Sequence, residues 1–85
     1  MVRYDFTRQA ERIFLKLPSN LRKRILQKVE YYLSQPNPLI YADRLAGTQT
    51  PTFRFRVGDY RVIFDWEGES ILILSVGHRR EIYRG

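Results

Sequence analysis

The sequence lacks cysteine and contains a single histidine, His78, among its 85 residues. Without cysteine the chain cannot form disulfides or thiolate metal sites, which fits a reducing compartment. No apolar run approaches the roughly 18 residues that a membrane-spanning helix needs. The N-terminal stretch MVRYDFTRQ turns polar at once, unlike a secretory signal peptide. We therefore expect a cytoplasmic protein with no membrane segment.

Acidic side chains are scarce, because 9 Asp and Glu stand against 15 Lys and Arg, for a net charge of +6. Such an excess suggests a polyanionic partner, such as nucleic acid, a ribosome, an anionic membrane or an acidic protein segment. On charge alone, a soluble basic protein without such a partner explains the composition equally well. The hydrophobic content of 44% is ample for one core, so we expect a single domain over residues 1–85.

The first half of the chain predicts a short strand and two helices. Residues 2–6, VRYDF, alternate as an opening strand does. Thr7 is suited to cap a first helix that Pro18 stops. Either Ser19 or Asn20 is expected to cap a second helix, which Pro36 closes and which forms an antiparallel hairpin with the first. The predicted apolar stripes contain Ala10, Ile13, Phe14 and Leu17 in the first helix and Leu21, Ile25, Val29, Tyr32 and Leu33 in the second.

The second half predicts an antiparallel sheet. Residues 36–51 form a loop with a short strand near 43–45, and strands follow at 52–57, 60–66 and about 70–77. Helices first and a meander afterwards indicate an α+β domain. In this fold an N-terminal helix hairpin packs on one face of a small, mostly antiparallel, twisted sheet.

The stretch FRFRVGDYRVIF, residues 53–64, places arginines on one face of a predicted hairpin. A two-residue turn at Gly58-Asp59 pairs Val57 with Tyr60 and Arg56 with Arg61. The aromatic and aliphatic residues of both strands then share the buried face. Like charges directly opposite each other destabilise a hairpin. The exposed face therefore carries the three arginines Arg54, Arg56 and Arg61.

The next hairpin turns at residues 67–69, and its loop length decides which residues join the arginines. A two-residue loop buries Ile71, Ile73 and Ser75, whereas a three-residue loop buries Leu72, Leu74 and Val76. We prefer the second register because it buries no hydroxyl. It adds Arg79 to the exposed arginine face, over an apolar floor of Ile63, Ile71 and Ile73.

These arginines are candidate anion binders, because a guanidinium keeps its proton at any useful pH. The alternative is that basic residues on an open face are merely solvated or prevent edge pairing. His78 is the side chain best suited to proton transfer near pH 7, although a histidine at a strand end is often only a surface residue. The sequence shows no Gly-rich phosphate loop, no Ser/His/Asp set and no metal-ligand cluster, so we expect no cofactor and no metal.

The order of elements, with GDYRVIF and VGHRREIY as its most specific motifs, resembles the RelE/ParE superfamily of bacterial and archaeal toxins. The resemblance covers about residues 2–84 and is nearer to the RelE branch. It implies a toxin of a type II toxin–antitoxin system that acts as an endoribonuclease, or mRNA interferase, on the ribosome. It implies a cognate antitoxin, the ribosome and mRNA as partners.

The resemblance also implies roles for individual residues. Arg61 and Arg79 match arginines that stabilise the transition-state phosphate, and Tyr83 matches a tyrosine that orients the RNA. Arg54 lies where the family commonly has a basic residue for acid–base work. Thr52 stands where a lysine is expected, so the general base and acid stay open, and His78 is a candidate. The expected catalytic residues are Arg54, Arg61, His78, Arg79 and Tyr83, and the expected RNA- or phosphate-binding residues are Arg56 and Arg80.

Two other functions stay open at this point. The first is a ParE-like toxin that poisons DNA gyrase and cuts nothing. The resemblance argues against it, because that branch generally lacks the nuclease residues. The second is a catalytically silent module whose basic face binds an antitoxin or another acidic peptide.

Overall fold

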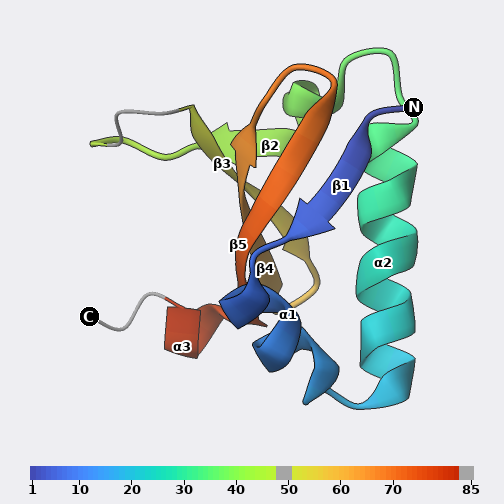
Figure 1. Cartoon of the computed structure of the whole chain (residues 1–85), viewed down its shortest axis with the longest axis vertical. Coiled ribbons are helices and arrows are strands. Elements are labelled where there is room, and N and C mark those ends of the chain that lie inside the picture. Colours follow the sequence, from blue (N-terminus) through green and yellow to red (C-terminus); the bar gives the residue numbers. More distant parts are fainter. Residues whose placement is uncertain (48–50, 83–85) are drawn as a thin grey trace.

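A mixed sheet with strand order β1-β5-β4-β3-β2 forms the centre of the computed structural model, which describes residues 1–47 and 51–82 (Figure 1). β1 pairs with β5 in parallel, and the other pairs are antiparallel. The strands are β1 (Arg3–Phe6), β2 (Ala42–Arg44), β3 (Thr52–Val57), β4 (Tyr60–Trp66) and β5 (Ser70–His78). The helices are α1 (Arg8–Leu15), α2 (Ser19–Leu33), the short 3-10 helix η1 (Pro38–Tyr41) and α3 (Arg79–Ile82). This is the predicted α+β fold, with the unpredicted η1 and α3 added.

Local sequence signals set most of the helix ends. Thr7 caps α1 as predicted, since its Oγ1 accepts the backbone N–H of Ala10 at 3.1 Å. The prediction that Ser19 or Asn20 caps α2 is wrong, because the helix already begins at Ser19 and Pro18 precedes it without a side-chain cap. The Pro18 carbonyl instead accepts the N–H groups of Leu21 and Arg22, each at 3.0 Å. The chain thus reverses between α1 and α2, which run in opposite senses in the view of Figure 1.

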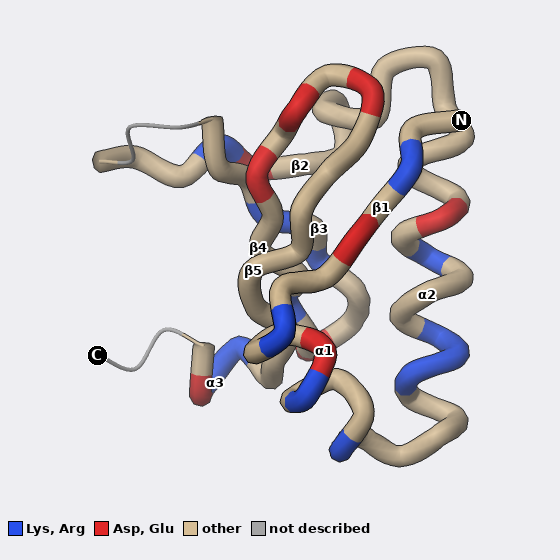
Figure 2. Tube along the Cα trace, in the orientation of Figure 1, with Lys and Arg blue, Asp and Glu red and all other residues tan. Residues whose placement is uncertain are grey.

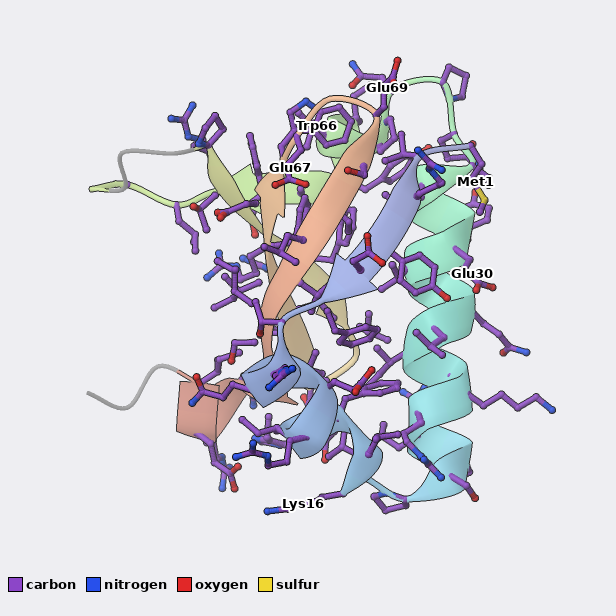
Figure 3. The ribbon with its side chains drawn as sticks, in the orientation of Figure 1. Met1, Lys16, Glu30, Trp66, Glu67 and Glu69 are labelled. Atoms are coloured by element: carbon purple, nitrogen blue, oxygen red, sulfur yellow. The ribbon has the colours of Figure 1, made fainter. Side chains whose placement is uncertain are left out.

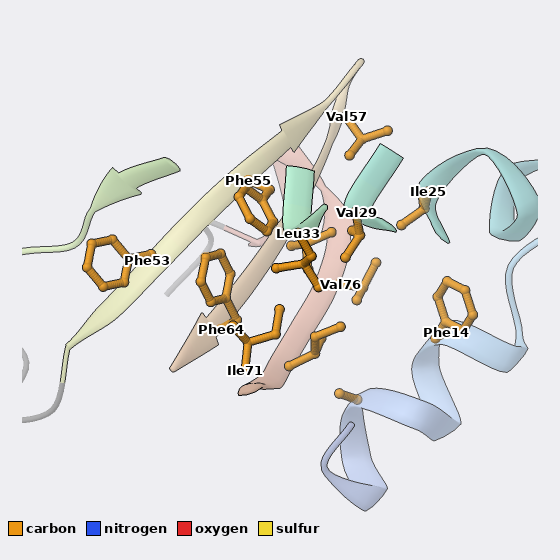
Figure 4. Close-up of a cluster of buried hydrophobic side chains, with 13 residues drawn as sticks. Phe14, Ile25, Val29, Leu33, Phe53, Phe55, Val57, Phe64, Ile71 and Val76 are labelled. Carbon is orange, nitrogen blue, oxygen red and sulfur yellow. The ribbon is translucent and has the colours of Figure 1, made fainter. Parts of the chain in front are cut away.

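The core lies between the helices and one face of the sheet, which we call the inner face (Figure 4). α2 contributes a buried stripe of Ile25, Val29 and Leu33, as its periodicity predicts. α1 buries Ala10 and Phe14, whereas Ile13 of the predicted stripe is 39% exposed. The strands contribute Phe53, Phe55, Val57, Val62, Phe64, Ile71, Ile73 and Val76.

The hairpin of β3 and β4 has the predicted register. Val57 pairs with Tyr60, Arg56 with Arg61 and Phe55 with Val62. Gly58 supplies the positive φ that the turn requires, at 59°. As a result the alternate apolar residues of both strands face the helices, and the arginines face away from them. We call this second side of the sheet the outer face.

The hairpin of β4 and β5 does not have the predicted register. Trp66 pairs with Ile71 and Phe64 with Ile73, but Ile63 pairs with Ser75, so Leu74 is an extra residue in a β-bulge. The prediction that Ile71 and Ile73 form an outer floor is therefore wrong, since both are 1% exposed in the core. The bulge at Leu74 shifts the alternation of inward and outward side chains after Ile73. Val76 is therefore buried as well, and Ser75 faces outward. Neither of the two predicted registers, which alternate without a bulge, could bury Val76 together with Ile71 and Ile73.

Candidate functional site

Three arginines lie on the outer face of two adjacent strands. Arg54 and Arg56 come from β3 and Arg61 from β4, and Arg56 stands directly opposite Arg61. The strand alternation that buries Phe55 and Val62 sends these side chains to the other side of the sheet. Opposed like charges destabilise a strand pair, so Arg56 and Arg61 repel each other across the strands.

The carboxylate of Asp43 binds two of these arginines. Asp43 on β2 pairs with Arg54 across the strands. Its Oδ2 accepts hydrogen bonds from Nε and Nη2 of Arg54, at 3.2 and 2.9 Å, and from Nε of Arg56 at 3.1 Å. The hydrogen bond from Arg54, assisted by the charge of Arg56, holds the pKa of Asp43 below its usual range. Asp43 therefore remains an anion between two cations at neutral pH.

Arg61 and Arg79 lie at the turn that joins β3 to β4. Arg61 Nη1 donates to the carbonyls of Gly58 and Tyr60, at 2.8 and 2.9 Å. The backbone N–H of Arg79 donates to the carbonyl of Asp59 at 2.8 Å, and its Nε lies 3.7 Å from the Asp59 carboxylate. Arg61 and Arg79 therefore both contact this turn, and Arg79 does so from the start of α3, not by strand alternation as predicted.

Arg79 begins α3, which folds back over the outer face. A Cβ placed on Gly77, the outer-face partner of Arg61, would lie 3.9 Å from Cβ of Ile82 in α3. Such a distance is an ordinary van der Waals contact, so α3 lies against the sheet beside Arg61. Figure 1 shows α3 on the opposite side of the sheet from α2.

His78 lies on the other side of β5 from this arginine group. It pairs with Tyr60, and the two rings meet edge to face with centroids 5.4 Å apart. Its Nδ1 accepts the backbone N–H of Arg80 at 3.1 Å, and the side chain of Arg80 is exposed. The structure therefore does not bring His78 together with Arg54 and Arg61. Tyr83, the remaining predicted site residue, lies outside the described residues.

Sequence reasoning missed the two acidic partners of the site, Asp43 and Asp59. A turn residue such as Asp59 could have been paired with a neighbouring arginine, because it adjoins the hairpin. Asp43 could not, because its register against β3 depends on the loop that connects β2 to β3. The position of Thr52 also has a structural explanation, since its hydroxyl donates to Asp65 at 2.6 Å and the residue is buried.

The site can bind an anion with fixed positive charges. Guanidinium groups offer planar pairs of donors that match carboxylate and phosphate oxygens. Within residues 1–47 and 51–82, no three acidic or histidine side chains gather as a metal site would require. Over the same residues, none of the helices is both long and apolar enough to span a bilayer.

Comparison with known proteins identifies the family. Residues 4–83 match the model of the ParE toxin of the type II toxin–antitoxin system parDE. No significant match is found among curated protein sequences.

Solved structures of RelE proteins share the fold. RelBE2, a toxin–antitoxin complex from Mycobacterium tuberculosis, matches with 29% identity and a TM-score of 0.78, over 92% of this chain and 98% of that one. The archaeal RelE–RelB complex from Pyrococcus horikoshii OT3 matches with 28% identity and a TM-score of 0.70, over 94% and 97%. The isolated Escherichia coli RelE toxin, at 22% identity and a TM-score of 0.72 over 98% and 92%, matches in fold. The chain therefore belongs to the ParE toxin family, within the RelE/ParE superfamily of type II toxin–antitoxin toxins.

Proposed function

We propose that this toxin is an mRNA interferase, an endoribonuclease that cleaves mRNA on the ribosome without a metal ion. The observation that carries the proposal is the arginine group on the outer face, in which Arg56 and Arg61 are directly opposed. Like charges that face each other repel, and an external anion that lies between them relieves this repulsion. The phosphodiester backbone of RNA is such an anion.

The reaction uses the 2′-OH of the RNA as its nucleophile. The 2′ oxygen attacks the adjacent phosphorus, the bond to the 5′ oxygen breaks, and the products carry a 2′,3′-cyclic phosphate and a 5′-OH. The proton of the 2′-OH passes to a base and the 5′ oxygen receives a proton from an acid. The intermediate phosphorane carries extra negative charge, which fixed guanidiniums stabilise.

Arg61 and Arg79 are the residues we assign to the phosphorane, because both lie at the Gly58–Asp59 turn. Arg54 and Arg56 bind the neighbouring backbone on β3, and Arg80 extends the positive charge beyond Arg79. We keep Tyr83 as the residue that orients a base, since stacking on aromatic rings is the usual way to hold single-stranded RNA.

Proton transfer is the weaker part of this mechanism. His78 faces away from Arg61, so it reaches the RNA only where the RNA chain passes around the end of β5. Without a strong base, the rate depends on the RNA being held in line for attack. The ribosome can supply that alignment, which accounts for a toxin that acts on translated mRNA.

We also assign a cognate antitoxin as the partner that keeps the toxin inactive, and the cytoplasm as its location. Three solved structures at 27–29% identity support this assignment. Two are complexes of RelE with RelB, and the third is the toxin–antitoxin complex RelBE2. Side chains such as Ile40, at 73% exposed, and Leu15, at 57%, offer apolar surface for such a partner.

Poisoning of DNA gyrase is the second candidate function. One observation favours it, because the family model that matches residues 4–83 describes ParE toxins. In that case the outer arginines would contact a protein or DNA, and no RNA would be cut.

Primer extension on a reporter mRNA in a translating extract separates the candidates. We expect discrete cuts within the reading frame with the wild-type protein and none with Arg61→Ala. Arg12→Ala is the matched control, because it removes an exposed arginine from α1 on the inner side of the sheet. Intact mRNA together with gyrase-linked DNA breaks would refute the proposal and favour the second candidate.

A further inference from the structure

The strongest unexplained feature of the outer face is that two guanidiniums share one carboxylate oxygen. Nε and Nη2 of Arg54 and Nε of Arg56 all point to Oδ2 of Asp43, within 2.9–3.2 Å. Arg54 and Arg56 are alternate residues of one strand, so their side chains leave β3 in the same direction. The carboxylate of Asp43 therefore occupies the point on which both side chains converge.

This carboxylate is accessible to solvent. The side chain of Asp43 is 46% exposed and that of Arg56 is 62% exposed, whereas Arg54 is 19% exposed. Exposed ion pairs contribute little to stability, because water and salt compete with them. Another anion can therefore replace Asp43 without disturbing the core. Arg54, with most of its side chain covered, provides a firm base for either anion.

A phosphate group matches this point in both charge and geometry. Its non-bridging oxygens accept the same parallel N–H donors as a carboxylate. Asp43 is ionised at neutral pH as an ordinary aspartate is, and the hydrogen bond from Arg54 lowers its pKa further. In the free protein the carboxylate thus stands where a phosphate oxygen would lie.

We propose that Arg54 and Arg56 form a preformed site for a backbone phosphate of RNA, and that Asp43 occupies this site until RNA displaces it. The proposal rests on the proposed function for the identity of the anion. Asp43 holds the two guanidiniums in place in the free toxin and competes with RNA for them. It is a positioning residue, and its removal should strengthen RNA binding.

The test compares Asp43→Asn with Glu11→Gln. Both substitutions remove one negative charge with little change in shape, but Glu11 is exposed on α1, on the inner side of the sheet. The probe is a fluorescent 2′-O-methyl RNA oligonucleotide, which lacks the nucleophilic hydroxyl, so anisotropy reports binding without cleavage. We expect Asp43→Asn to bind this RNA about 3- to 10-fold more tightly than Glu11→Gln at equal salt. Equal affinities of the two variants would overturn the proposal.

A second measurement applies to the wild-type protein and needs no variant. Adding the same RNA should shift the Nε–Hε NMR signals of Arg54 and Arg56 together. It should also raise the pKa of the Asp43 carboxyl toward its ordinary value, followed by carbon NMR. If both arginine signals and the Asp43 titration stay unchanged in saturating RNA, the proposal is wrong.

An acidic protein segment is the other anion that this site could take. If Asp43→Asn strengthens binding of a poly-glutamate peptide but leaves RNA binding unchanged, the site belongs to a protein partner and the proposal fails. The proposal is independent of cleavage in these assays. Intact mRNA in the primer-extension experiment, together with tighter RNA binding by Asp43→Asn, would refute the nuclease and support the phosphate site.

Discussion

Arg61 lies where the two parts of the arginine group meet. Across the strands it faces Arg56, which shares Asp43 with Arg54, and along the chain it binds the turn that also holds Arg79. Its two hydrogen bonds to carbonyl oxygens fix the guanidinium without neutralising its charge. Arg61 thus links the arginines of β3 with the turn that Arg79 contacts.

Replacing Arg61 should lower activity far more than stability. We expect Arg61→Ala to reduce cleavage by roughly 100-fold or more, because one donor to the phosphorane is lost. The free energy of unfolding should fall by only about 0.5–1 kcal/mol, since the hydrogen bonds to Gly58 and Tyr60 are partly solvated and the repulsion from Arg56 is relieved. Cleavage assays and thermal unfolding measure the two quantities.

Arg61→Lys is the informative companion variant. It keeps the charge but loses the planar pair of donors, so we expect partial recovery of cleavage. Full activity of Arg61→Ala would remove Arg61 from the mechanism. A large loss of stability in Arg61→Ala would contradict its position on the outer face.

At the scale of elements, β5 determines which residues reach each face of the sheet. Its bulge at Leu74 lets both ends of the strand present β-branched residues to the core. The same bulge places Gly77 on the outer face opposite Arg61, where α3 packs. The core and the candidate site therefore depend on one irregularity in this strand.

Alanine substitutions on either side of the strand test this register. Ile73→Ala should lower the free energy of unfolding by about 2–4 kcal/mol, because it leaves a cavity in the core. Leu72→Ala should cost about 1 kcal/mol or less, since Leu72 pairs with Asp65 on the outer face and is only half-buried. Urea unfolding of the two variants decides the point. A larger loss of stability in Leu72→Ala than in Ile73→Ala would favour the predicted register, in which a three-residue loop buries Leu72 and Leu74.

A hydrogen bond ties the parallel edge strand β1 to α2. The hydroxyl of Tyr4 donates to Oε2 of Glu30, which Figure 3 labels on α2, at 2.7 Å. This bond, with smaller effects of burial and of the charge of Glu30, raises the pKa of Tyr4 to about 12. It links segments that are 26 residues apart in sequence.

The Tyr4 hydrogen bond should make a contribution to stability that is lost at high pH. Because the folded pKa of about 12 exceeds the ordinary value of 10.0, the contribution is complete below pH 10 and disappears as pH rises through 12. We expect Tyr4→Phe to be less stable than wild type by about 1 kcal/mol at pH 8. This difference should shrink progressively above pH 10 in urea unfolding experiments.

Tyr31→Phe is the matched control for Tyr4→Phe. Within the described residues the Tyr31 hydroxyl donates no hydrogen bond, and its side chain is exposed. Its removal should leave stability at pH 8 nearly unchanged. Equal losses in the two variants would show that the Tyr4–Glu30 bond adds nothing.

At the scale of the whole molecule, charge is unevenly distributed. Figure 2 shows acidic residues gathered around the β4–β5 turn, whereas basic residues line α2 and the region of α1. The sheet separates the helix side from the arginine face. The net charge of +6 favours acidic partners on either side.

Co-expression tests the partner expected for this toxin. We expect that the chain alone arrests growth, and that the small open reading frame next to its gene restores growth and co-elutes with it in size-exclusion chromatography. The physical reason is that an acidic, partly apolar segment can cover exposed residues such as Ile40 and Leu15 together with the basic surface. A chain that elutes alone and leaves cells unharmed would contradict this expectation.

Elements whose signals are local could be predicted from the amino-acid sequence. The Thr7 cap, the apolar period of α2 and the Gly58-Asp59 turn specify their own neighbourhoods, because each acts over a few residues. Once the turn was placed, strand alternation put Arg54, Arg56 and Arg61 on one face. The fold class followed from these patterns taken in order, and the family from the resemblance that GDYRVIF and VGHRREIY carry.

Features that depend on contacts between distant segments could not be predicted from the sequence and are seen only in the folded chain. The bulge in β5 exists because the core rewards burial of Ile71, Ile73 and Val76 together, which no uniform alternation allows. Asp43 meets Arg54 and Arg56 because β2 pairs with β3 across a loop whose geometry the sequence does not specify. His78 was separated from the arginines, and Arg79 was brought to them, by where β5 ends and α3 begins. Each of these outcomes balances competing long-range contacts, which local propensities do not contain.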